Sequence, residues 1–181
     1  MILRIAWGLS FLAACAGPRV VVTGGVHGNE PSGAKALPEL EKRGFLAFGP
    51  CNPWGLERDR RELEDGRDLN RLFGAKNLAE VARVRQFLDK SRPQLFLDLH
   101  EDGDATGAYL IQIDPESDLA ERIVAELKSE IEFEAKPTWG PVFGRDGVLK
   151  PDKKSLGLQA LSNQWSLAFY VWWTYKITAF T

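Results

Sequence analysis

The chain has 181 residues, of which 44% are hydrophobic and 27% charged, and this composition fits one water-soluble domain over residues 1–181 better than two. The formal net charge of -2 and the pI near 5.8 provide no general attraction to nucleic acid or to an anionic membrane surface. We therefore expect no nucleic-acid partner and no membrane partner, and any function must be argued from a specific site.

The N-terminal segment superficially resembles a lipoprotein signal, because an apolar stretch follows Arg4 and ends at Cys15. A lipidated Cys15 would leave three residues before the first predicted strand, and the apolar stretch is shorter than the roughly 20 residues that cross a bilayer. We favour a cytoplasmic protein in which Cys15 and Cys51 are reduced and buried. Lipoprotein export through Cys15 is the alternative.

The first half of the chain alternates between strand and helix signals. Arg19 to Val26 is a β-branched run, typical of a strand buried on both faces of a parallel sheet. A helix from Pro31 to Arg43 and a strand from Gly44 to Cys51 should follow. Residues 52–73 are dense in charged residues and glycine without periodicity, which predicts a long ordered loop of the kind that is usually functional.

The second half continues the alternation, with Asn77 as the cap of its first helix. Strands alternating with helices predict an α/β fold, with a mixed, largely parallel central sheet and helices on both faces. The predicted elements are a helix over Asn77–Arg92, strands over Gln94–Leu99 and Gly107–Ile113, a helix over Pro115–Ile131, a surface loop or hairpin over Trp139–Pro151, a buried helix over Ser162–Tyr175 and a strand over Lys176–Thr181.

The two histidines of the chain both follow predicted buried strands, His27 after the first and His100 after the third. The carboxyl ends of parallel strands form the edge where ligands bind in open α/β sheets. Glu30 lies three residues beyond His27, so a tight turn can bring both side chains to one point. Two imidazoles and a carboxylate suit one catalytic Zn²⁺ per chain. Two unrelated histidines, one capping a helix and one in the core, are the less favoured interpretation.

Four motifs occur in an order that indicates a known family. The sequence from about Arg19 to Gln112 resembles the zinc carboxypeptidase superfamily, and most closely its branch of succinylglutamate desuccinylases and aspartoacylases. The resemblance implies a zinc-carboxypeptidase-like fold. The motifs are Gly24–Gly33, Asn52–Gly55, Asp68–Arg71 and Asp98–His100.

The resemblance implies roles for five residues. His27, Glu30 and His100 match the zinc ligands, and Asn70 with Arg71 matches the pair that binds a substrate carboxylate. A guanidinium offers two parallel donors to a carboxylate, which suits Arg71 to that role.

Two further roles also come from the resemblance. Arg61 matches the catalytic arginine that polarises the scissile carbonyl and stabilises its oxyanion. Asp68 matches the aspartate that accepts a hydrogen bond from the first metal-binding histidine, and so fixes its tautomer and orientation. Asp98 shares a strand face with His100 and is either a similar partner or a buried structural carboxylate. Other arginines of the same loop are alternatives to Arg61, unless they are only a solvated charged face: Arg58, Arg60 and Arg67.

The general base of this superfamily is a glutamate on a late strand, and the sequence has no glutamate after Glu134. Lys176–Thr181 resembles the strand that leads to that residue, so we expect a C-terminally truncated chain whose base would lie beyond Thr181. Glu101 is a poor substitute because neighbours on an extended segment point in opposite directions. With Asp102 and Asp104 it is expected to shape the pocket rim.

The sequence thus predicts a zinc hydrolase that cleaves an amide bond adjacent to a free carboxylate through a zinc-activated water. The substrate would be an N-acyl amino acid, as for a deacylase of the desuccinylase or aspartoacylase type, or a peptide, as for a metallocarboxypeptidase. One alternative is a catalytically inactive zinc-binding or scaffold domain that lacks the general base. A metal-free α/β domain is the other.

Overall fold

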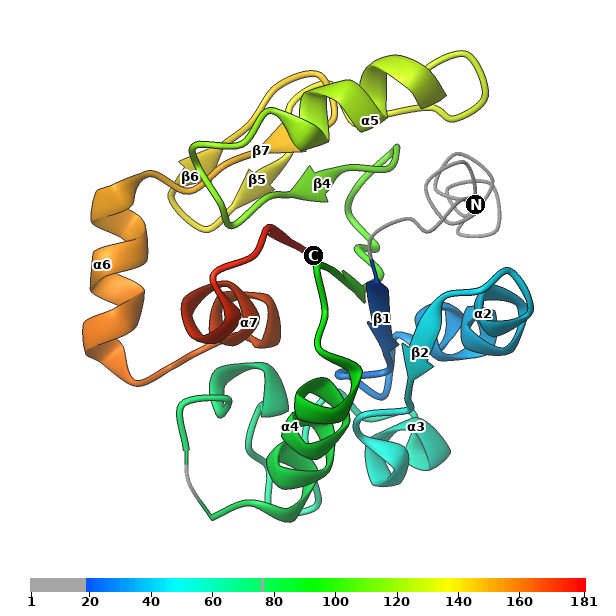
Figure 1. The fold of residues 1–181 in the computed structure, drawn as a ribbon, viewed down its shortest axis with the longest axis vertical. Coiled ribbons are helices and arrows are strands. Elements are labelled where there is room, and N and C mark those ends of the chain that lie inside the picture. Colours follow the sequence, from blue (N-terminus) through cyan, green and yellow to red (C-terminus); the bar gives the residue numbers. More distant parts are fainter. Residues whose placement is uncertain (1–18, 76) are drawn as a thin grey trace.

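The computed structural model describes residues 19–75 and 77–181, so the lipoprotein hypothesis for Cys15 concerns a residue outside that part (Figure 1). The helices are α2 (Pro31–Lys42), α3 (Pro53–Arg58), the 3-10 helix η1 (Leu69–Arg71), α4 (Ala79–Ser91), α5 (Leu119–Leu127), α6 (Lys153–Ser162) and α7 (Leu167–Tyr175). The strands are β1 (Val20–Gly24), β2 (Leu46–Phe48), β3 (Leu95–Leu99), β4 (Leu110–Ile111), β5 (Thr138–Trp139), β6 (Val142–Phe143), β7 (Val148–Leu149) and β8 (Ala179–Phe180).

The central sheet has the order β2-β1-β3-β8, and its neighbouring strands all pair in parallel. An isolated antiparallel bridge between Gln112 and Phe180 joins the end of the β4 segment to β8. The sheet is therefore largely parallel with an antiparallel attachment, as the sequence predicted.

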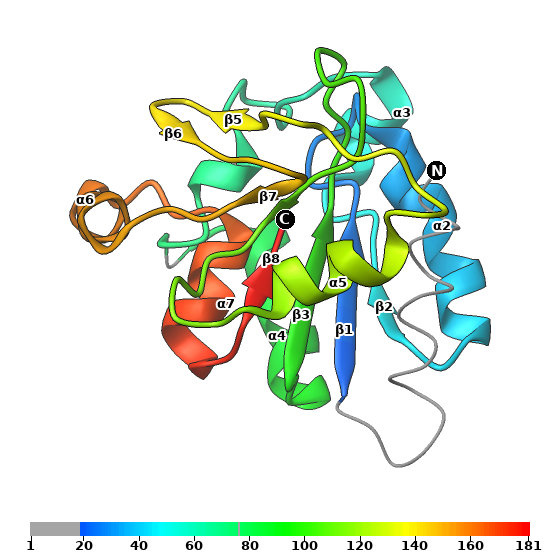
Figure 2. The ribbon, with the colours of Figure 1, turned by 90° about the horizontal axis from the view of Figure 1, so that it is seen from above.

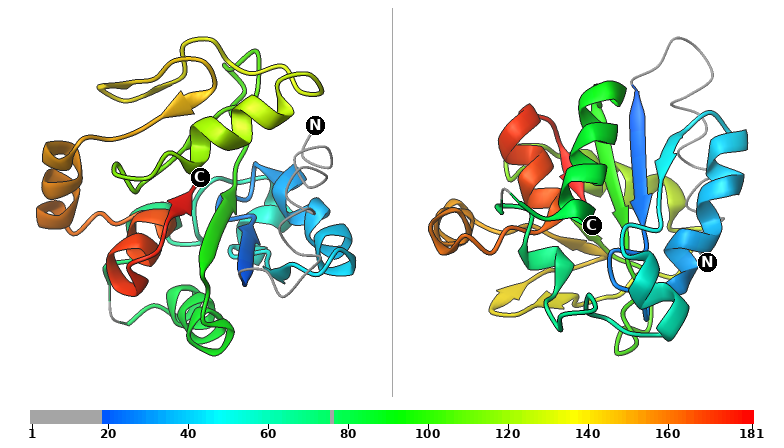
Figure 3. Two further views of the ribbon diagram at one scale, coloured as in Figure 1. Left: turned by 45° about the horizontal axis from the view of Figure 1, so that its top comes forward. Right: turned by 90° about the horizontal axis from the view of Figure 1, so that it is seen from below.

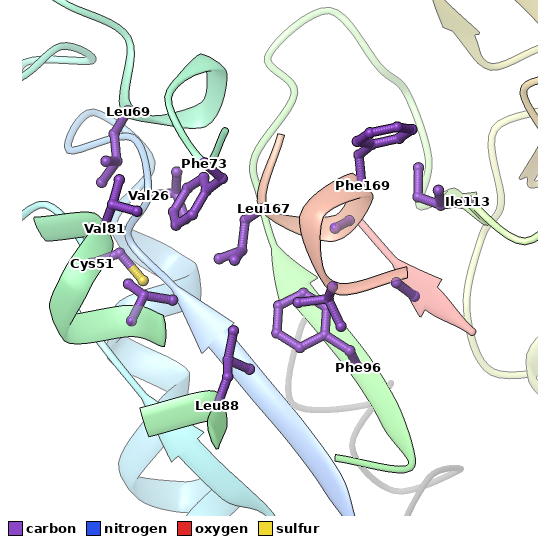
Figure 4. Packing of buried hydrophobic residues seen from close by; sticks show 14 of the residues in the cluster. Val26, Cys51, Leu69, Phe73, Val81, Leu88, Phe96, Ile113, Leu167 and Phe169 are labelled. Atoms are coloured by element: carbon purple, nitrogen blue, oxygen red, sulfur yellow. The ribbon is translucent and has the colours of Figure 1, made fainter. Parts of the chain in front are cut away.

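Helices cover both faces of this sheet. Figure 2 shows α5 in front of β1 and β3, and the view from below in Figure 3 shows α4 in front of β3 and beside β1. Because side chains alternate along a strand, β1 supplies both cores. Val21 packs in the cluster that contains α4 and α7 residues, whereas Val20 and Val22 pack in the cluster that contains α2 and α5 residues. Figure 4 shows the first of these clusters, in which Phe96 of β3 lies near Leu88 of α4 and Leu167 of α7.

Three predicted segments differ from the structure. The segment 52–73 is not wholly irregular, because Pro53 begins α3 and the Asn52 side chain accepts a hydrogen bond from Gly55 N at its start. Helix α4 begins at Ala79 after an N-cap at Leu78, without the side-chain cap predicted from Asn77. The helix predicted over residues 115–131 is shorter in the structure, where α5 covers only Leu119–Leu127.

The region after α5 was predicted least well. The hairpin within 139–151 is confirmed by the antiparallel pair β5 and β6. The same segment was expected at the surface, but Val148 and Leu149 form the buried strand β7, which pairs in parallel with β4. Helix α6 was not predicted, and Figures 1 and 3 show it at the edge of the fold. Helix α7 starts at Leu167, after the Ser166 cap, which is five residues later than expected.

None of the helices within the described ranges is long and apolar enough to cross a membrane.

Candidate metal centre

His27 and Glu30 lie on the tight turn between β1 and α2. Glu30 N donates to His27 O over 3.3 Å, and α2 begins directly afterwards at Pro31. The turn is packed against α3 and the residues just after it: a Cβ atom on Gly28 would lie 2.0 Å from Gly55 C and 2.4 Å from Arg60 O. Glycine between the two side chains therefore allows the backbone of α3 to approach.

His100 follows β3, the parallel neighbour of β1. The register pairs Gly24 with Leu99, so the residues that follow both strands emerge at the same edge of the sheet. The ring centroids of His27 and His100 are 4.8 Å apart, although 73 residues separate them in the sequence. The sheet thus brings the predicted pair together.

The carboxylate of Glu30 lies between the two imidazoles. Glu30 Oε1 is 2.7 Å from His27 Nδ1, and Glu30 Oε2 is 2.7 Å from His100 Nδ1. Glu101 N donates to Glu30 Oε2 over 3.1 Å. Glu30 and His27 are buried, and His100 is partly exposed. One ligand atom from each of the three residues lies within 4.8 Å of the others.

The other nitrogen of each ring is held by its own aspartate. His27 Nε2 is 3.1 Å from Asp68 Oδ1, and His100 Nε2 is 3.0 Å from Asp98 Oδ2. An outer carboxylate of this kind fixes the ring and leaves the inner nitrogen free to bind a metal. Both aspartates were candidates from the sequence, and both lie where they can orient a histidine.

These contacts shift the pKa values of the groups. Burial raises the pKa of Glu30, but hydrogen bonds with His100 and His27 outweigh it and leave the pKa well below its usual range. Burial likewise opposes ionisation of Asp68, and the contacts with His27 and Arg61 bring its pKa far below normal. Burial lowers the pKa of His100, but Asp98 and Glu30 raise it to about 10.

The donor set fits a divalent metal with a preference for nitrogen. Two imidazole nitrogens and a carboxylate oxygen converge, which is a ligand set of catalytic zinc sites. A proton shared between Nδ1 and the carboxylate is what a metal ion would replace, since binding to histidine releases protons. His27, Glu30 and His100 are therefore the described residues that could hold such an ion.

Arg61 is the arginine of the loop that reaches this centre. Its Nη1 donates to Glu30 Oε1 over 3.2 Å and its Nη2 to Asp68 Oδ2 over 3.1 Å. The Arg61 side chain remains partly exposed, at 38%, and it lines the cavity described below. Two neighbouring arginines instead form exposed ion pairs: Arg58 with Glu57, and Arg67 with Asp65.

Asn70 and Arg71 lie on η1, next to the Asp68 cap. The Asp68 carboxylate accepts a hydrogen bond from Asn70 N over 2.8 Å, which fixes this short helix beside the centre. Asn70 Oδ1 accepts from Leu167 N over 2.8 Å, so the side-chain oxygen anchors the start of α7. Arg71 Nη1 donates to Asn70 O over 2.9 Å.

A cavity of about 720 Å³ adjoins these groups, and His27, His100, Arg61, Asn70 and Arg71 all line it. This volume accommodates a small-molecule or short peptide ligand. Much of the remaining wall is apolar or aromatic and comes from the β3–β4 region and the hairpin: Leu97, Leu99, Ala105, Ala108, Tyr109, Leu110, Ile111 and Trp139.

The acidic residues after His100 have other contacts. Glu101 Oε1 accepts from Ser32 N over 2.5 Å, at the first turn of α2, which directs the carboxylate to the helix. Asp102 Oδ2 accepts from the Tyr109 hydroxyl over 2.7 Å. Glu101 and Asp102 line the cavity, as expected for a rim, whereas Asp104 is not among its lining residues.

Sequence reasoning did not identify Thr23 or Tyr109 as part of this region. Thr23 is buried and donates to Asp98 Oδ1 over 2.7 Å. The available signal was a single hydroxyl within an apolar strand, which needs a partner when buried. Tyr109 lay within a run interpreted only as a strand, and no sequence signal placed its hydroxyl in the cavity.

The sequence was compared with protein families and curated proteins, and the structure with solved structures. The family model described as the succinylglutamate desuccinylase/aspartoacylase catalytic domain matches residues 16–138. None of the curated proteins compared with the sequence matches it.

Among solved structures, a proposed metallopeptidase from Shewanella denitrificans OS217 superposes with a TM-score of 0.67 at 16% identity, covering 99% of this chain and 78% of that one. A metallo-carboxypeptidase from Burkholderia cenocepacia superposes with a TM-score of 0.59 at 16% identity, covering 93% of this chain and 48% of that one. The succinylglutamate desuccinylase from Chromobacterium violaceum superposes with a TM-score of 0.59 at 18% identity, covering 90% of this chain and 53% of that one. At these identities the likeness establishes the shared fold.

Proposed function

Because the chain belongs to the family of succinylglutamate desuccinylase/aspartoacylase catalytic domains, we propose that it is a zinc-dependent hydrolase that cleaves an amide bond next to a free carboxylate. One observation carries the proposal: His27 Nδ1, His100 Nδ1 and the Glu30 carboxylate converge, while Asp68 and Asp98 hold the far nitrogen of each ring.

We assign His27, Glu30 and His100 as the ligands of one Zn²⁺ per chain. Bound zinc would supply Lewis-acid polarisation of a carbonyl and would lower the pKa of water to about 7. Asp68 keeps the His27 ring in the orientation that presents Nδ1 to the metal, since its carboxylate contacts Nε2 over 3.1 Å.

Arg61 is assigned to the scissile carbonyl. Its guanidinium is held at the edge of the centre by Glu30 and Asp68 and lines the cavity. A positioned cation beside the carbonyl stabilises the negative charge that develops on its oxygen. The two carboxylates hold Arg61 in place before a substrate arrives, so little reorganisation is needed.

Asn70 and Arg71 are assigned to the substrate carboxylate. Both line the same cavity as the histidines, and the Asn70 backbone anchors the arginine through Nη1. The remaining donors of Arg71 can form a paired contact with a carboxylate. Such a contact would orient the amide bond toward the histidines and Arg61.

Two substrate classes satisfy this arrangement, an N-acyl amino acid and the C-terminus of a peptide. The family favours the first class, and the cavity of about 720 Å³ has room for the second. Both carry the free carboxylate that Arg71 would bind. Measuring hydrolysis of N-acyl amino acids beside short peptides separates them.

The first test is zinc content by elemental analysis of wild type, His100→Ala and Asp104→Ala. We expect about one zinc per chain in wild type and in Asp104→Ala, which lies outside the cavity lining, and little in His100→Ala. Absence of zinc from wild type, or full zinc in His100→Ala, would contradict the assignment.

A zinc-binding domain without hydrolytic activity is the second candidate, and it has a specific observation in its favour. The general base is unassigned in the described ranges, since the Glu101 carboxylate accepts a hydrogen bond from Ser32 N. Stoichiometric zinc without turnover of any carboxylate-bearing amide would favour this candidate. Turnover that is lost in Arg61→Ala with zinc retained would favour the hydrolase.

A further inference from the structure

A chain of buried hydrogen bonds links the first strand of the sheet to the second histidine. The Thr23 hydroxyl donates to Asp98 Oδ1 over 2.7 Å, and Asp98 Oδ2 lies 3.0 Å from His100 Nε2. Thr23 is 0% and Asp98 1% exposed. Solvent therefore has little access to Asp98, and within the described part of the chain each of its oxygens has one hydrogen-bond partner.

The parallel pairing of β1 and β3 builds this chain. Thr23 and Asp98 are register partners on the adjacent strands. Two residues after Asp98, on the same face, His100 leaves the end of β3. The orientation of the Asp98 carboxylate is thus set by the sheet itself, whereas Asp68 is positioned from a long loop.

The two aspartates also differ in charge environment. Asp68 shares its carboxylate with Arg61, over 3.1 Å. Across the residues with described coordinates, Asp98 contacts the Thr23 hydroxyl and the His100 ring and forms no ion pair with a lysine or arginine. Its negative charge therefore acts on His100 without a competing cation, which makes that imidazole the better electron donor.

We propose that Thr23 and Asp98 are positioning residues, which set the affinity of His100 for the metal by holding Nε2 and turning Nδ1 toward Glu30. This inference rests on the proposed zinc site. A purely structural role, in which the pair only ties β1 to β3, would stabilise the sheet but leave zinc affinity unchanged.

A second threonine–aspartate pair gives a matched control. The Thr178 hydroxyl donates to Asp114 Oδ2 over 3.1 Å, beside β8 and without contact to a histidine. Thr23→Val and Thr178→Val each remove a hydroxyl and retain the shape of the side chain. Thr23→Ser restores the hydroxyl. Of these three variants, only Thr23→Val should disturb His100.

The test is competition for zinc with a chromophoric chelator, read as the dissociation constant of each purified protein. We expect Thr23→Val to raise the zinc Kd about tenfold and Asp98→Asn to raise it by up to about 100-fold. Thr23→Ser and Thr178→Val should stay close to wild type. Thermal unfolding of the chelator-treated proteins checks that Thr23→Val and Thr178→Val are folded.

The outcomes separate this inference from the proposed function. Wild type that binds zinc, with Thr23→Val and Asp98→Asn no weaker than Thr178→Val, would overturn the positioning role alone. Wild type that binds no zinc would overturn both proposals. If Thr23→Val does not fold, Asp98→Asn decides, because it retains the volume of the side chain and can still accept the hydrogen bond from Thr23.

Discussion

Gly28 is the residue of the metal-binding turn at which the smallest substitution should have the largest effect. A Cβ atom there would lie 2.0 Å from Gly55 C, 2.3 Å from Leu56 N and 2.4 Å from Arg60 O. Real Cβ contacts are essentially never shorter than 3.0 Å, and these three partners are backbone atoms that cannot rotate away. In Gly28→Ala, either the turn or α3 must move.

The expected cost follows from that geometry. Overpacking costs about 1–3 kcal/mol, and a clash with backbone belongs at the upper end. For a chain of this size about 3 kcal/mol lowers Tm by roughly 6–12 °C. Movement of the turn separates His27 from Glu30, and movement of α3 displaces the segment that carries Arg61. We therefore expect weaker zinc binding as well.

The assay is thermal unfolding by circular dichroism, with zinc affinity from chelator competition. Gly103→Ala is the control, since a Cβ there meets open space and the residue lies in the loop just after His100. Its Tm should stay within about 2 °C of wild type. If Gly28→Ala resembled Gly103→Ala in both Tm and zinc affinity, the close approach of α3 to the turn would be refuted.

Three further results are expected. Zinc at 100 times its Kd should stabilise wild type by about 2.7 kcal/mol in thermal unfolding, a chelator should remove the gain, and Glu30→Gln should reduce it. In the metal-free protein the folded-state pKa of His100 is raised to about 10. The contribution of His100 to the free energy of unfolding is therefore complete below the ordinary pKa of 6.5 and is lost as the pH rises through 10. Urea unfolding across that pH range should show this free energy decline, and a flat profile would contradict the prediction. Asn70→Ala should lower the free energy of unfolding by about 1–3 kcal/mol because it leaves Leu167 N without an acceptor, measured by urea denaturation.

The arrangement of the candidate ligands was predictable because it depends on regular structure. A β-branched run before His27 and an apolar run before His100 indicate parallel buried strands, and the carboxyl ends of such strands meet at one edge. The spacing from His27 to Glu30 fits one turn before a helix. These signals are local, and the sheet converts them into a contact over 73 residues.

Elements that depend on tertiary packing were less predictable. In α6 the apolar side chains do not gather on one face: Leu156 is buried while Leu158 and Leu161 are 60% and 83% exposed. Strand β7 has two residues and exists because β4 pairs with it. The sequence did contain a signal for α3, the Asn52 cap followed by Pro53. The density of charged residues in this segment nevertheless favoured the prediction of a loop.

The role of Glu101 shows how the site and the fold share the same groups. Glu30 occupies the N-cap position of α2, yet its side chain makes no cap hydrogen bond, because both oxygens contact histidines. The first turn of α2 then needs another acceptor, and Glu101 supplies it through Ser32 N. Glu101 N in turn donates to Glu30 Oε2. The residue after His100 thus releases Glu30 for the centre and ties the two ligand-bearing turns together, a structural role that competes with action as the general base.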